Sequence, residues 1–87
     1  MKIKDGFVLK NLGGKNIVIA VGERSKEFNG IVNLNTTGVF LWQLLSEGSN
    51  ETKLVLELCN KFEIDKKTAQ EDVAAFIGSL TSAGFIE

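Results

Sequence analysis

The sequence contains no histidine and no proline, and it has a single cysteine. Without histidine, the chain lacks the commonest general base at neutral pH and a leading metal ligand. One cysteine cannot form an internal disulfide, which fits a reducing cytoplasm. Because no proline and no Ser- or Gly-rich linker interrupts the 87 residues, we expect a single domain over residues 1–87.

Charge of one sign is not in excess either. Ten Lys and Arg against eleven Asp and Glu give a formal net charge of −1. Non-specific binding to nucleic acid or to an anionic membrane needs a surplus of cations, so neither partner is expected. No apolar run approaches the roughly 20 residues that span a bilayer, and residues 1–6 lack the apolar stretch of a secretory signal. These features predict a cytoplasmic location.

What the sequence does contain begins with three β-rich runs. Residues 7–12 and 16–21 are separated by Gly13-Gly14-Lys15, and a glycine pair with positive φ is typical of a hairpin turn. A polar loop over residues 22–29 leads to a third short strand, Gly30 to Leu34. The sequence therefore predicts a three-stranded antiparallel meander in the order one, two, three.

Three helices are predicted after the strands. The first covers residues 36–46, with Asn35 as its cap and Gly48 after its end. Ser49 or Asn50 caps the second helix, and Asp65 caps the third. The apolar stripe of the third helix consists of Ala69, Val73, Phe76, Ile77 and Leu80. Three strands followed by three helices predict an α+β domain of winged-helix-like arrangement, with residues 84–86 folded back onto the core.

The junction between the third strand and the first helix is the most informative segment. Gly38 falls in the first turn of the helix, where a missing Cβ allows another group to approach closely. Trp42 lies on a helix with almost no polar face, so we expect it in the core. No further strand follows Leu34, which predicts that one edge of the third strand stays unpaired.

No set of residues predicts an enzyme or a cofactor site. Cys59 lies on the apolar stripe of the second helix and is expected to be a buried structural thiol. Glu71 and Asp72 are adjacent, so on a helix they point about 100° apart and do not form a facing acid–base pair. The Gly13-Gly14 pair is a turn, because no phosphate-loop Lys-Ser/Thr follows it.

A winged helix that binds DNA places cationic and amide side chains of its third helix in the major groove. Here that helix opens with Lys66 and Lys67, becomes acidic at Glu71 and Asp72, and then carries small residues. A DNA-binding regulator is therefore the second hypothesis, and a homodimer formed by pairing of the free edges is a third.

An ordered set of short motifs resembles the coenzyme PQQ synthesis protein D family over residues 6–86. The motifs are Asn33-Leu34-Asn35-Thr36-Thr37-Gly38, Leu41-Trp42, Leu44-Leu45, Phe62-Glu63-Ile64-Asp65, and Asp72-Val73 with Phe76, Leu80 and Gly84. The resemblance implies a RiPP recognition element, a small winged-helix-type domain without catalysis of its own. Such a domain captures the leader region of a ribosomally made precursor peptide and presents it to a modifying enzyme, often a radical SAM protein.

The resemblance also implies a mode of capture, in which the leader adds as a strand beside the third strand, against the third helix. The peptide-binding residues that it implies are Gly30, Ile31, Val32, Asn33 and Leu34 on the strand, and Asp72, Val73, Phe76 and Ile77 on the helix. The short strand with a free edge independently suits peptide addition. The direction of the added strand, and whether Ile31 with Asn33 or Val32 with Leu34 faces the free edge, stay open. The pathway also stays open, because PQQ, lasso and sactipeptide routes all fit the resemblance.

Overall fold

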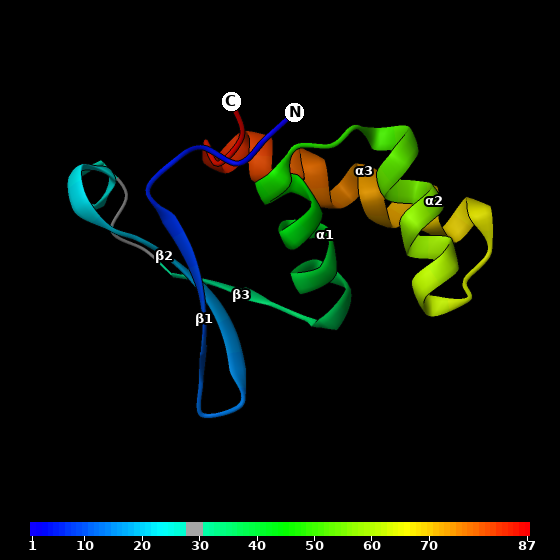
Figure 1. Ribbon diagram of the computed structural model, residues 1–87, viewed down its shortest axis with the longest axis horizontal. Coiled ribbons are helices and arrows are strands. Elements are labelled where there is room, and N and C mark those ends of the chain that lie inside the picture. Colours follow the sequence, from blue (N-terminus) through cyan, green and yellow to red (C-terminus); the bar gives the residue numbers. More distant parts are fainter. Residues whose placement is uncertain (28–30) are drawn as a thin grey trace.

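The computed structural model describes residues 1–27 and 31–87. In these residues a three-stranded sheet is followed by three helices (Figure 1). The strands are β1 (Phe7–Leu12), β2 (Lys15–Ala20) and β3 (Ile31–Leu34), with a short 3-10 helix, η1 (Gly22–Lys26), between β2 and β3. The helices are α1 (Thr36–Glu47), α2 (Glu51–Phe62) and α3 (Lys66–Ala83). The predicted α+β, winged-helix-like architecture is confirmed.

The sheet is the predicted antiparallel meander in the order β1-β2-β3. Gly13 and Gly14 have φ angles of 59° and 82°, so both turn residues use the conformation that favours glycine. The second strand runs from Lys15 to Ala20, one residue earlier than predicted, because the chain turns at Gly22 into η1. Gly30, the first residue of the predicted third strand, lies outside the described residues.

Two asparagine caps set the starts of α1 and α2. The Asn35 Oδ1 atom accepts a hydrogen bond of 2.8 Å from the Gly38 N–H. The Asn50 Oδ1 atom accepts one of 2.8 Å from the Lys53 N–H, so Asn50 and not Ser49 caps α2. The predicted capping by Asp65 is wrong in one respect: the residue holds the N-cap position of α3, but its side chain makes no cap hydrogen bond. Its carboxylate is exposed and can be hydrated instead.

Both chain termini join the hydrophobic core. Trp42 and Phe85 are buried, as predicted. Their rings pack edge to face, with the ring centroids 5.7 Å apart. The rings of Phe85 and Phe7 also pack edge to face, with their centroids 4.5 Å apart. The Lys4 N–H donates to the Phe85 carbonyl oxygen (2.8 Å), and Ile3 pairs with Ile86 as an antiparallel bridge. The last residues therefore close the core between the sheet and α1.

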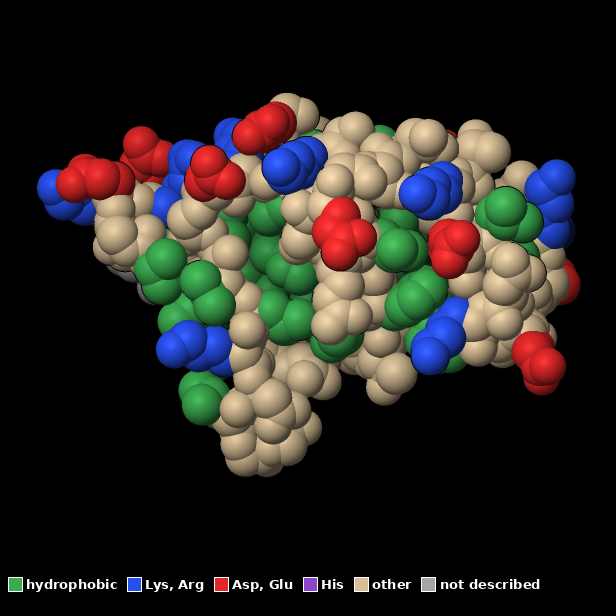
Figure 2. All heavy atoms as spheres, viewed as in Figure 1, with side chains coloured by type: hydrophobic (Ala, Val, Ile, Leu, Met, Phe, Trp, Pro, Cys, Tyr) green, Lys and Arg blue, Asp and Glu red, His purple; other side chains and the backbone are tan. Residues whose placement is uncertain are grey.

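Hydrophobic side chains gather in a hollow between the sheet and the helices on the face shown in Figure 2. A groove of about 670 Å³ lies between β1 and α1 there; its lining residues are Phe7, Val8, Leu9, Trp42, Gln43, Ser46 and Glu47. None of the helices in residues 1–27 and 31–87 has the length and apolar character needed to cross a bilayer.

Candidate functional site

β3 is an edge strand of the described sheet. It pairs with β2 on one side through Ile19–Ile31, Val18–Val32, Ile17–Asn33 and Asn16–Leu34, and no other described strand pairs with it. An edge strand presents a row of backbone N–H and C=O groups that another chain can pair with. This edge is the first component of the candidate site.

The register determines which residues of β3 point their backbone groups outward. The Val21 N–H donates to the Gly6 carbonyl oxygen (2.8 Å), so the backbone of Val21 faces β1. Because this direction alternates along a strand, Asn16 and Val18 face β3, and their partners Leu34 and Val32 face β2 in return. Ile31 and Asn33 therefore direct their N–H and C=O groups to the free edge. The alternative that the sequence left open is resolved in favour of this pair.

A cleft of about 280 Å³ lies where β3 passes into α1, opposite α3. Its lining residues come from two elements: Asn35, Thr37, Gly38 and Leu41 from the cap and start of α1, and Asp72, Ala75, Phe76 and Ser79 from α3. The α3 residues are spaced i, i+3, i+4 and i+7, which places them on one face of the helix. Asn35, the residue that directly follows β3, and this face of α3 thus border one concave surface.

Gly38 allows the close junction between β3 and α1 at this cleft. Gly38 is buried, and a Cβ atom there would lie 3.1 Å from the Asn35 Oδ1 atom and 3.4 Å from the Leu34 Cβ atom. The same Oδ1 atom accepts hydrogen bonds from the Gly38 N–H (2.8 Å) and the Thr37 hydroxyl (3.1 Å). The close approach predicted at Gly38 is confirmed, and its partners are the last strand residue and the helix cap.

The structure places the expected helix residues in different surroundings. Asp72 and Phe76 line the cleft, with Asp72 exposed and Phe76 half-buried. Ile77 is half-buried, packs against the core and is absent from the cleft lining. Val73 is 0% exposed, so its implied role as a peptide contact is corrected: its side chain lies in the core and has no surface to offer. The inward side of α3 carries Val73 because the helix packs that face against the core.

The expected strand residues divide by the two faces of the sheet. Val32 and Leu34 are half-buried against the core, whereas Ile31 is 62% exposed and Asn33 is exposed. Gly30 falls outside the described residues. The six cleft residues that sequence reasoning did not assign are Asn35, Thr37, Gly38, Leu41, Ala75 and Ser79. Helical spacing from Asp72 could have found Ala75 and Ser79, but the α1 residues enter the cleft only through tertiary packing.

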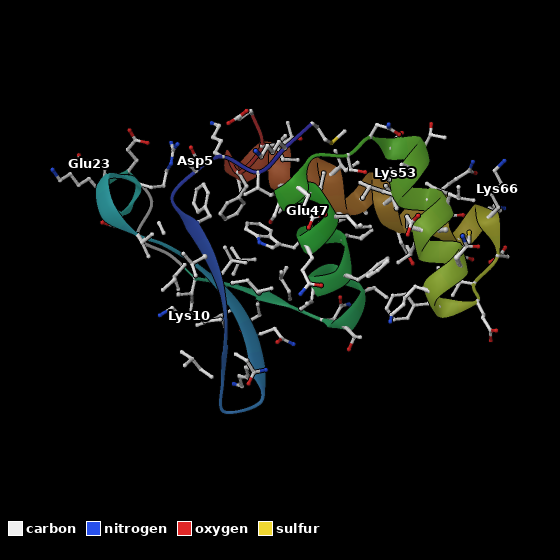
Figure 3. All side chains as sticks on the ribbon, viewed as in Figure 1. Asp5, Lys10, Glu23, Glu47, Lys53 and Lys66 are labelled. Atoms are coloured by element: carbon white, nitrogen blue, oxygen red, sulfur yellow. The ribbon has the colours of Figure 1, made fainter. Side chains whose placement is uncertain are left out.

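Charged side chains are dispersed around the molecule (Figure 3). Lys10 lies on the sheet, Lys53 lies on α2, and Lys66 lies at the far end of the helical part; Glu47 lies between Lys10 and the other two. The ion pairs of the described residues are in η1 and its C-cap: Arg24 to Glu27 at 3.1 Å and Lys26 to Glu23 at 3.3 Å. Within residues 1–27 and 31–87, no group of three or more His, Cys, Asp or Glu could hold a metal ion.

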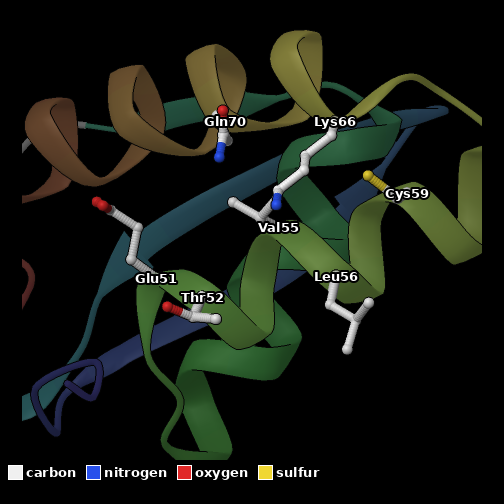
Figure 4. Close-up of a pocket in the computed structure, with 7 residues that line it drawn as sticks. All are labelled: Glu51, Thr52, Val55, Leu56, Cys59, Lys66 and Gln70. Carbon is white, nitrogen blue, oxygen red and sulfur yellow. The ribbon is translucent and has the colours of Figure 1, made fainter.

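A second concave surface, of about 490 Å³, lies between α2 and α3 (Figure 4). Its lining residues are Glu51, Thr52, Val55, Leu56, Cys59, Lys66 and Gln70. Cys59 is half-buried at this surface, so the prediction that it is a buried thiol is wrong. The helix is rotated so that Leu54, Val55 and Leu58 fill the core while Cys59 reaches its boundary. All of its lining residues come from α2 and α3, and it shares none of them with the cleft of the candidate site.

Comparisons with known proteins identify a family from the sequence and a shared fold from solved structures. A family model of coenzyme PQQ synthesis protein D (PqqD) matches residues 7–86. No curated protein matches the sequence. One similar solved structure is TbiB1 in complex with the TbiA(beta) leader peptide, with a TM-score of 0.78 and 23% identity, covering 100% of this chain and 95% of that chain. Another is a lasso peptide synthetase B1 complexed with the leader peptide, with a TM-score of 0.75 and 19% identity, covering 97% of this chain and 93% of that chain.

Proposed function

The chain belongs to the coenzyme PQQ synthesis protein D family, and from this premise we propose that it is an adaptor that binds the leader region of a ribosomally synthesised precursor peptide. The leader adds as a strand to the outer edge of β3, and some of its side chains enter the cleft beside α3. The observation that carries the proposal is the free edge of β3, which ends at a cleft containing Asp72 and Phe76.

The geometry supports this mode of binding in two ways. The outward N–H and C=O groups of Ile31 and Asn33 can pair with any extended peptide, which supplies affinity independent of sequence. Because side chains alternate along a strand, every second leader residue projects toward the side of the sheet that carries the helices. The similar proteins TbiB1 and the lasso peptide synthetase B1 are both structures with a leader peptide bound.

The adaptor has no catalysis of its own in this proposal and presents the leader to a modifying enzyme of the radical SAM type. No cofactor is assigned to it. It acts in the cytoplasm, where ribosomes release precursor peptides. The peptide contacts that we propose are the backbone of Ile31 and Asn33 and the side chains of Asp72 and Phe76, with Val32 and Leu34 bordering the core side of the edge. Ile77, at the margin of the core, is proposed to support Phe76.

The test begins with selection of peptides on the full chain. Random displayed peptides of about 15 residues, longer than a usual strand, are selected for binding, and each selected peptide is then titrated into isotope-labelled protein. We expect the largest amide shifts at Ile31 and Asn33, together with slower hydrogen exchange of these two amides. Their N–H groups gain a partner only if a strand is added at this edge.

Two proline variants provide the matched control. Asn33→Pro removes an outward N–H and should stay folded, because proline is tolerated at a strand edge whose N–H faces solvent. It should weaken peptide binding more than about tenfold, or about 1.4 kcal/mol. Val32→Pro removes an N–H that bonds to β2 and should lower the free energy of unfolding instead. Normal binding by folded Asn33→Pro protein, or largest shifts on β1, would overturn the proposal.

A further inference from the structure

We propose that the cleft beside α3 selects a basic residue, Lys or Arg, at one position of the bound peptide, and that Asp72 is the residue that determines this preference. The inference rests on the proposed strand addition at β3. It assigns to the cleft a side-chain specificity that the free backbone edge cannot supply.

Asp72 is the one formally charged residue of the cleft lining. The other seven lining residues are Asn35, Thr37, Gly38, Leu41, Ala75, Phe76 and Ser79, all uncharged. Along the same face of α3, the positions one turn before and one turn beyond the lining residues, Thr68 and Ser82, are also uncharged. The cleft therefore carries a local charge of −1 although the positive and negative charges of the whole chain nearly cancel.

The Asp72 carboxylate is available to a ligand. Neither an ion pair nor a hydrogen bond joins its side chain to any residue in the described ranges 1–27 and 31–87. Lys66 and Lys67 precede it on α3 by six and five positions, so neither has the i, i+3 or i, i+4 spacing of a helical ion pair. A carboxylate beside an otherwise uncharged cleft, with no cation in its lining, favours a cationic partner.

The N-terminus of α1 also borders the cleft, and its partial positive charge would favour an anion. That end is already capped. The Asn35 Oδ1 atom accepts hydrogen bonds from the Gly38 N–H and the Thr37 hydroxyl, so a partial negative charge from this chain already lies against the helix end. Asp72 therefore decides the sign of the charge that the cleft attracts.

The uncharged lining suits the rest of a basic side chain. Ala75, which is exposed, and Phe76, which is half-buried, offer apolar surface to the methylene groups of Lys or Arg, which bury their stems while the charged head stays near water. Phe76 lies one helical turn from Asp72 and lines the same cleft, so an aromatic side chain is available there to a cation. A negatively charged or short polar side chain would leave this surface unused.

Peptide selection on matched variants tests the inference. The same random displayed library is selected on the wild-type chain, on Asp72→Asn, on Asp72→Lys and on Glu71→Gln. Glu71 is the control, because it is exposed, lies next to Asp72 in sequence and is absent from the cleft lining. We expect Lys or Arg at one fixed position with the wild type and with Glu71→Gln, no such enrichment with Asp72→Asn, and Asp or Glu at that position with Asp72→Lys.

Titration of one selected peptide measures how much its basic residue contributes to the binding affinity. Replacing its basic residue by Gln should weaken binding to the wild-type protein about fivefold, which is the upper range for an exposed ion pair. The same replacement should weaken binding to the Asp72→Asn protein less than about twofold. The difference between these two losses of affinity should become smaller as the salt concentration is raised. Peptides that still protect the Ile31 and Asn33 amides but show no basic preference, or an equal loss with both proteins, would overturn this inference and leave the proposed function standing. Failure of every selected peptide to protect these amides would overturn both.

Discussion

At Gly38 the absence of a side chain decides how closely β3 and α1 can join. The Asn35 Oδ1 atom is 3.1 Å from the position that a Cβ atom would take, and that oxygen also accepts the capping hydrogen bond from the Gly38 N–H. The oxygen cannot move away from a new methyl group without weakening its own bond. One residue therefore couples the end of the free edge to the start of the helix.

Gly38→Ala and Gly78→Ala should have different effects on stability. Gly78 also lies in a helix, but no atom is within 4 Å of its Cβ position, so alanine there should stabilise by about 0.5 to 1 kcal/mol. Gly38→Ala should be less stable than Gly78→Ala by about 1 to 2 kcal/mol, because the gain in helix propensity is offset by the damaged cap. Urea unfolding followed by the fluorescence of Trp42 measures both. Equal stability of the two variants would show that the junction tolerates a side chain.

Among the elements, the two terminal segments act together although they are far apart in sequence. α3 ends at Ala83, and its C-cap Gly84, with a φ of 83°, turns the chain back toward residues 2–4. The Lys4 N–H donates to Phe85, and the Glu87 N–H donates to the Lys2 carbonyl oxygen at 3.1 Å. Phe85 thereby reaches a position between Phe7 of β1 and Trp42 of α1.

Phe85→Ala should lower the free energy of unfolding by about 3 to 5 kcal/mol, because it removes a fully buried ring that contacts both layers. This loss is a large part of the stability expected for so small a protein. Calorimetry or urea unfolding measures the effect. The control is deletion of Glu87 alone, which removes one exposed backbone hydrogen bond and should cost about 1 kcal/mol. A loss below about 1 kcal/mol for Phe85→Ala would mean that the tail does not close the core in solution.

For the whole molecule, the distribution of charge argues against DNA binding and leaves peptide binding as the favoured function. The net charge is −1, and the labelled lysines are dispersed over the fold, with Lys10 on the sheet and Lys53 and Lys66 on the helical part (Figure 3). The outward side of α3 is acidic at Glu71 and Asp72. Phosphate binding needs cations gathered on one surface, which this arrangement does not provide.

The protein should therefore not bind duplex DNA at physiological salt. Fluorescence anisotropy of a random labelled duplex, titrated with protein, measures this directly. The strongest contrary result would be micromolar binding that weakens steeply with added salt, which would favour the winged-helix regulator over the adaptor. A Lys66→Gln, Lys67→Gln double variant would then show whether the start of α3 contacts the phosphates.

Local chemistry was enough to predict most of the fold. The Gly13-Gly14 turn, the Asn35 cap and the apolar spacing of the helices act over a few residues, so the sequence alone determined the order of strands and helices. The site was only partly predictable. Asp72 and Phe76 reach the cleft, but Val73 is buried, and Cys59 lies at the boundary of the core.

Tertiary structure decided what remained, because these features depend on contacts between distant segments. The register between β2 and β3 determined that Ile31 and Asn33 face the free edge, and no residue of β3 carries that information by itself. The rotation of α3 against the core determined which of its apolar residues are buried and which border the cleft. The packing of α1 against β3 brought Gly38 and Leu41 opposite Asp72, since a cleft between two elements exists only after both have docked on the same core.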